Sequence, residues 1–84
     1  MPLIDILWDL PNDPAGNVAH IAEHGLVPSD VEYILNNPLR KERSRSSGLP
    51  LVRGRIPSGE LVIVVYQQID QHTIYPITAY PVEI

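Results

Sequence analysis

Apolar runs in the second half of the chain predict β-strands. Residues 61–66 read LVIVVY, an unbroken apolar run typical of a strand that is covered on both faces, so we expect it at the centre of a sheet. Apolar runs over 49–55 and 72–80 flank it, with polar turns between them. This pattern predicts a three-stranded antiparallel meander. Pro76 interrupts the last run, and because proline has no amide hydrogen we expect an edge position or a bulge there.

The first half predicts a short strand and a helix. Residues 3–8, LIDILW, are apolar apart from one acid and fit a strand. Asp13 and Pro14 have the order of an N-cap and a first helical residue, and apolar residues follow at helical spacing. The spacing predicts a helix over 14–24. Gly25 comes next, where a left-handed C-terminal residue is common.

A second helix and the overall fold class follow from the same reasoning. Ser29 and Glu32 have the S-x-x-E spacing of a capping box, and Pro38 cannot continue the helix that they begin. We therefore expect a single α+β domain over residues 1–84. Its predicted order is one strand, two helices and then the three-stranded antiparallel meander.

All the positive side chains lie between residues 40 and 55, here called the basic stretch, although the chain has a formal net charge of −4. The stretch carries one acid, Glu42, and is therefore strongly positive, while the other nine acids make the rest of the chain negative. Serines and Gly48 follow the first cations, so we expect a loop over 40–48. The six cations are Arg40, Lys41, Arg43, Arg45, Arg53 and Arg55.

This basic stretch has two interpretations. A charge run is commonly a solvated loop. The clustering, and the predominance of arginine, which binds phosphate and carboxylate with two parallel hydrogen bonds, favour an anionic partner. That partner is RNA or the acidic surface of another protein, because the negative remainder of the chain would repel nucleic acid elsewhere. A second copy of the chain is another candidate, since an 84-residue domain has a modest core.

Composition excludes several classes of site. The chain has no cysteine, so it has neither a disulfide nor a thiolate nucleophile or ligand. No segment approaches the roughly 18 consecutive apolar residues of a membrane span, and no basic leader precedes the first apolar run. We expect a cytoplasmic protein with no membrane partner and no cofactor.

His20 and His24 are four residues apart and share one face of the predicted first helix with Asn17. The pair is open to three interpretations: a polar helix face, general acid and base catalysis near neutral pH, or metal binding. Their spacing lacks the following glutamate of a zinc-binding helix, and no clear third ligand is present, so we predict no metal site. Trp8 ends an apolar run and is expected in the core.

Several residues along the chain are similar in order and spacing to a known family. They are Trp8-Asp9, Asn17, His24-Gly25, Gly54-Arg55, the LVIVVY run and Ile77-Thr78-Ala79. With these features the chain resembles the BrnT-type toxins, ribonucleases of bacterial toxin and antitoxin pairs. The resemblance implies a fold related to RelE, metal-independent cleavage of RNA, and a protein antitoxin as partner. One departure is that residues 56–84 contain no Lys or Arg, whereas the family usually has basic residues in and after its last strand and a basic C-terminal helix.

Metal-free cleavage of RNA requires a base, an acid and cations close to the phosphate. His20 and His24 can be the base and acid, Arg53 and Arg55 can bind the phosphate, and Tyr80 or Tyr75 can donate a hydrogen bond. The other cations are predicted to bind RNA: Arg40, Lys41, Arg43 and Arg45. The alternative is a non-catalytic binding module of the same fold that pairs with an acidic protein or with itself.

Overall fold

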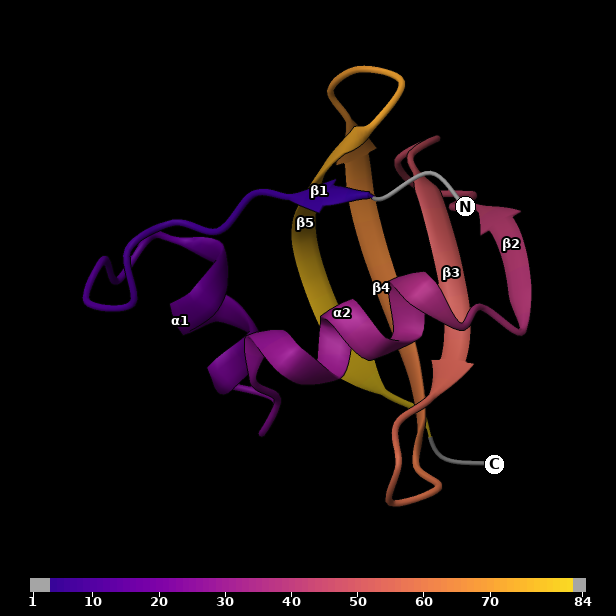
Figure 1. Ribbon diagram of the computed structural model, residues 1–84, viewed down its shortest axis with the longest axis horizontal. Coiled ribbons are helices and arrows are strands. Elements are labelled where there is room, and N and C mark those ends of the chain that lie inside the picture. Colours follow the sequence, from indigo (N-terminus) through magenta and orange to yellow (C-terminus); the bar gives the residue numbers. More distant parts are fainter. Residues whose placement is uncertain (1–3, 83–84) are drawn as a thin grey trace.

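The strands form one mixed sheet, and the helices lie on one side of it (Figure 1). The computed structural model describes residues 4–82, and over these residues it contains a five-stranded sheet and two helices. The strand order across the sheet is β1-β5-β4-β3-β2. The elements are β1 (Asp5–Ile6), α1 (Asn17–Ala22), α2 (Pro28–Asn36), β2 (Arg40–Arg43), β3 (Pro50–Arg55), β4 (Leu61–Gln68) and β5 (Thr73–Pro81).

The pairing of the strands confirms the α+β class and the central position of the apolar run. β4 lies between β3 and β5, antiparallel to both, so both of its edges are paired. β1 joins the far side of β5 in parallel, with Asp5 opposite Thr73. The register slips at Pro76, which leaves Ile77 without a partner on β4 and confirms the predicted bulge.

The predicted loop at the start of the basic stretch is wrong, because residues Arg40–Arg43 form the edge strand β2. They pair antiparallel with β3, and a turn through Gly48, which has a φ of 74°, joins the two strands. The meander therefore runs from β2 to β5 and is longer than predicted. The sequence RKER has no apolar alternation, so periodicity could not identify this strand. The α+β class agrees with the prediction, whereas this five-stranded mixed sheet does not match the RelE-like fold that the resemblance implied.

The helices exist where they were predicted, with different ends. α1 is shorter than the predicted 14–24, and Gly25 closes it with a φ of 79° as expected. α2 begins at Pro28, and the carboxylate of Asp30, rather than Glu32, accepts a hydrogen bond from the Val27 amide at 3.1 Å. Within the described part of the chain, neither helix has the length and apolarity needed to cross a membrane.

The core lies between the helices and the sheet face that they cover. Gly54 of β3 marks the closest approach, because a Cβ atom there would come within 2.7 Å of the Ile34 side chain on α2. Trp8 is partly buried against this core and its indole N–H donates to Glu32 at 3.0 Å, which agrees with its expected place. The cluster comprises Ile21, Leu26, Val31, Ile34, Leu35, Val52, Val62, Val64, Tyr66, Ile74 and Ala79.

Candidate functional site

The face of the sheet that points away from α2, here called the open face, carries four of the predicted site residues: Arg40, Arg53, Arg55 and Tyr80. Side chains alternate between the two faces of a strand. Val52 and Gly54 of β3 and Val62 and Val64 of β4 face the helices, so the residues between them face the other way. The register then assigns these residues to the open face: Arg40, Glu42, Leu51, Arg53, Arg55, Leu61, Ile63, Val65, Thr78 and Tyr80.

The centre of the open face is apolar although no described helix covers it. Ile63 and Val65 are 6% and 9% exposed, yet neither belongs to the core cluster. Their neighbours across the strands, Leu51, Thr78 and Tyr80, are half-buried and shield them. The open face is thus an apolar strip with charged residues toward its β2 end.

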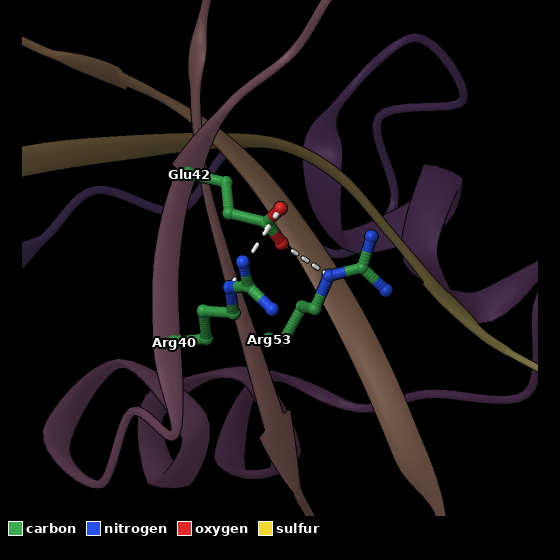
Figure 2. Close-up of polar contacts among 3 residues, drawn as sticks. All are labelled: Arg40, Glu42 and Arg53. Carbon is green, nitrogen blue, oxygen red and sulfur yellow. Dashed lines mark hydrogen bonds and ion pairs between the residues drawn. The ribbon is translucent and has the colours of Figure 1, made fainter.

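Two arginines meet one carboxylate at that end (Figure 2). Arg53 donates from Nε to Glu42, and Arg40 lies 3.9 Å from the same carboxylate. The hydrogen bond from Arg53 lowers the pKa of the Glu42 carboxyl, which is therefore ionised at neutral pH. Among residues 4–82 nothing accepts a hydrogen bond from the two terminal nitrogens of Arg53, and Figure 2 shows them extending toward β4. They can bind an oxyanion end-on.

The structure disperses the other predicted cations. Arg55 is on the open face, but its guanidinium donates to the Gly59 carbonyl of its own turn at 2.6 Å. Arg43 likewise donates to Gly48 at 2.7 Å, and Arg45 is exposed in the turn after β2. Lys41 pairs with Val52 and therefore lies on the helix side of β2. The basic stretch is divided between both faces of the sheet rather than forming one patch.

The histidine pair lies beside the β5 end of the open face. The rings of His20 and His24 have centroids 6.2 Å apart, and both residues are exposed. The His24 ring is also 6.2 Å from the ring of Tyr80, on β5. α1 packs against β5, and this contact puts His24, in the turn that follows α1, next to the sheet. His24 and Tyr80, 56 residues apart in sequence, are therefore neighbours.

Tyr80 and Arg53 occupy one row across the sheet, with Ile63 between them. Two steps between adjacent strands separate their backbones by about 10 Å, a gap that both long side chains help to span. The row, with His24 beside it, thus brings together an imidazole, a phenol, an apolar strip and a guanidinium. This arrangement can stack a base on Tyr80 and bind a neighbouring phosphate through Arg53.

Sequence reasoning missed a polar cluster between α1, β5 and the segment after β1. Asn17 is 2% exposed, donates from Nδ2 to the carbonyls of Leu7 and Pro76 at 3.0 Å, and accepts from the amide of Asp9. The hydroxyl of Tyr75 donates to Asp9 at 2.5 Å, and this bond, together with the Asn17 amide, lowers the pKa of the Asp9 carboxyl. The same bond raises the pKa of Tyr75. The cluster joins the segment after β1 to α1 and β5, and gives Asn17 a structural role.

No group of three or more His, Asp or Glu side chains is close enough to bind a metal ion within residues 4–82. No family model, curated protein or solved structure matches the chain.

Proposed function

We propose that the protein is a toxin-like ribonuclease that binds single-stranded RNA on the open face. The observation that supports this most directly is the row of Tyr80 on β5 and Arg53 on β3, with His24, from the turn after α1, beside Tyr80. The resemblance to BrnT-type toxins, stated from the sequence, suggests the same activity. A protein antitoxin is the corresponding partner.

The proposed reaction is a transfer within the RNA backbone. One histidine takes the proton of a 2′-hydroxyl, the 2′-oxygen bonds to phosphorus, and the bond from phosphorus to the 5′-oxygen breaks. The other histidine protonates the leaving 5′-oxygen, so the products are a 2′,3′-cyclic phosphate and a 5′-hydroxyl. Arg53 stabilises the negative charge that builds on the phosphoryl oxygens. These side chains supply both proton transfers, so the proposed mechanism needs no metal ion.

The two histidines have different surroundings, and this suggests different roles for them. The ring of His24 lies beside Tyr80 on the sheet, whereas His20 is four residues earlier in the chain and its ring lies beside that of His24. A nucleotide stacked on Tyr80 would place its phosphate closer to His24. We therefore propose His24 as the more important residue and His20 as its partner in proton transfer.

Cleavage of a labelled single-stranded RNA in the presence of EDTA tests this proposal. We expect products that end in a 2′,3′-cyclic phosphate, a rate about 10² to 10⁴ lower for His24→Ala, and a smaller loss for His20→Ala. Ser29→Ala, an exposed change on α2, is the control for handling and folding. Folded protein that leaves single-stranded and structured RNA intact over hours would refute the enzymatic function.

A second candidate function is a non-catalytic binding module. The ion pair of Arg53 with Glu42 and the position of β2 at the edge of the sheet favour it. Glu42 already neutralises part of the positive charge on the open face. β2 is an edge strand with cations on both of its faces, whereas the β5 side is covered at its start by β1 and lacks amide hydrogens at Pro76 and Pro81. A binding module that adds an acidic strand of another protein to β2 would match these features.

The two candidates predict different responses to the same substitutions. Arg53→Gln should weaken RNA binding and lower the salt slope by roughly one unit if the open face binds RNA phosphates. Affinity for an acidic extended peptide bound at β2 should also fall in Arg43→Gln, because Arg43 lies on this edge strand but faces away from the open face. A protein that binds the peptide and neither binds nor cleaves RNA is a binding module.

A further inference from the structure

A pocket of about 230 Å³ opens on the helix side of the sheet, away from the open face. Lys41 of β2 lines it, and its pairing with Val52 places it on the side of the core, whereas the neighbouring Arg40 is on the open face. The pocket lies between β2, β4 and the turn before β5. Its lining comprises Ile4, Lys41, Tyr66, Gln68, Gln71, His72 and Ile74.

The charge of this pocket is positive. The Lys41 ammonium has no ion-pair partner among the described residues. Arg43, two residues along the same face of β2, is close enough to act on Tyr66: burial raises the pKa of Tyr66 and the positive charge of Arg43 partly opposes this effect. Tyr66 is therefore protonated at neutral pH and can donate a hydrogen bond from its hydroxyl.

The nearest acid in the turn is already bound to its own backbone. The Asp70 carboxylate accepts from the His72 amide at 2.8 Å, and this hydrogen bond lowers the pKa of Asp70. Gln68 also bonds within the turn, from Nε2 to the Asp70 carbonyl at 2.5 Å. The side chains of Gln71 and His72 make no hydrogen bond within residues 4–82, so they are free to donate into the pocket. A cation and several hydrogen-bond donors thus line one side of the pocket.

The other side of the pocket is apolar, formed by Ile4 and Ile74. Its volume is below the roughly 300 to 1,000 Å³ typical of sites for drug-sized ligands, which favours a smaller ligand. A phosphate group has three strong acceptor oxygens, so it can accept hydrogen bonds from a lysine and several surrounding donors at once. A ligand with a single carbonyl group would satisfy fewer of them. An apolar or planar group attached to it can pack on the two isoleucines.

We infer that this pocket binds a small phosphate monoester of about mononucleotide size, with the phosphate at Lys41 and Tyr66 and the organic part on Ile4 and Ile74. This site is separate from the proposed RNA face, because β2 presents Lys41 and Arg40 to opposite sides of the sheet. It does not depend on the protein being a ribonuclease.

Calorimetric titration with adenosine 5′-monophosphate, inorganic phosphate and adenosine tests the inference. We expect the monophosphate to bind, inorganic phosphate to bind more weakly, and adenosine not to bind measurably. Lys41→Gln should weaken binding of the monophosphate by about tenfold or more, as for loss of a charge-assisted hydrogen bond. Tyr66→Phe keeps the ring and removes the hydroxyl, and should weaken it by about threefold to tenfold.

Arg40→Gln is the matched control, because it removes the same charge from the adjacent residue of β2 on the opposite face. It should leave binding of the monophosphate unchanged. Equal binding of adenosine and its monophosphate, or equal losses in Lys41→Gln and Arg40→Gln, would overturn the site. RNA cleavage measured on Tyr66→Phe separates the two proposals, since a change confined to the pocket should leave cleavage intact.

Discussion

The two faces of the sheet are built from the same strands and differ in what lies against them. On the helix side, Ile34 and Val64 are completely buried in a cluster that includes both helices. On the open face, Ile63 and Val65 are nearly as buried, but side chains of the sheet itself shield them. Burial alone therefore does not distinguish a core face from a binding face.

The difference lies in what borders each apolar group. The helix face has apolar neighbours and close backbone contacts, such as that of Gly54 with Ile34. The open face has an ion pair at one end and a histidine and tyrosine contact at the other. The first arrangement contributes stability, and the second leaves polar groups around a strip that a ligand can cover.

The largest expected effect is on stability, and it is measured by truncating one isoleucine on each face. Ile34→Ala removes a fully buried side chain from the rigid helix face and should lower the free energy of unfolding by about 4 kcal/mol. Ile63→Ala on the open face should cost about 2 kcal/mol, because the surrounding side chains border solvent and can relax into the space. Urea denaturation of both variants measures the difference. Equal losses would show that the open face is packed as tightly as the core.

Next in size is the effect of Asn17, which ties the region beside the open face to β5. Asn17→Ala removes the hydrogen-bond partner of the Asp9 amide and of the carbonyls of Leu7 and Pro76. It should lower the free energy of unfolding by about 3 kcal/mol or less. Asn36→Ala is the control: it removes a single exposed hydrogen bond and should cost at most about 0.5 kcal/mol. Similar urea midpoints for the two variants would contradict the structural role of Asn17.

A smaller effect, of opposite sign, is expected at the charged end of the open face. Glu42→Gln keeps an oxygen that can accept from Arg53 but removes the negative charge, so affinity for single-stranded RNA should rise about threefold to tenfold. Fluorescence anisotropy at low salt measures this change. Asp5→Asn removes the same charge from β1 at the other edge of the sheet and should have little effect. A fall in affinity in Glu42→Gln would mean that the open face does not bind phosphate through Arg53.

The smallest expected effect is in the pH dependence of stability. Hydrogen bonds from Tyr75 and Asn17 lower the pKa of Asp9 in the folded state. The contribution of Asp9 to stability is therefore fully present above its ordinary pKa of about 4, and it is lost as pH falls through the lower pKa of the folded state. Asp9→Asn should therefore reduce the fall in stability between about pH 5 and about pH 2. Urea midpoints measured across this range test it. An unchanged acid slope would show that the Asp9 carboxylate adds nothing to folding.

Much of the fold could be predicted from local patterns. The apolar run of β4 indicated its central position, Pro76 indicated the bulge, and Gly25 indicated the left-handed end of the first helix. β2 could not be predicted in this way, because charged residues at an edge have no periodic signal and depend on pairing with β3. The turn residues before β3, ending at Gly48, were the signal that could have indicated a hairpin.

The candidate site was predicted as a list of residues but not as an arrangement. The six cations were expected to act together, yet Lys41 faces the pocket on the helix side while Arg53 faces the open side. His24 and Tyr80 were both named, but their contact depends on how α1 packs against β5. Asp9 and Tyr75 were not identified as a hydrogen-bonded pair, since 66 residues separate them.

The sequence by itself determined the class of the fold, the central strand and the concentration of positive charge, because each follows from the composition or the spacing of nearby residues. The tertiary structure alone decided which cations share a face, which acid neutralises Arg53 and which tyrosine lies beside His24. The physical reason is the alternation of side chains along a strand. A single step in register moves a residue to the opposite face, and only pairing with distant strands fixes that register.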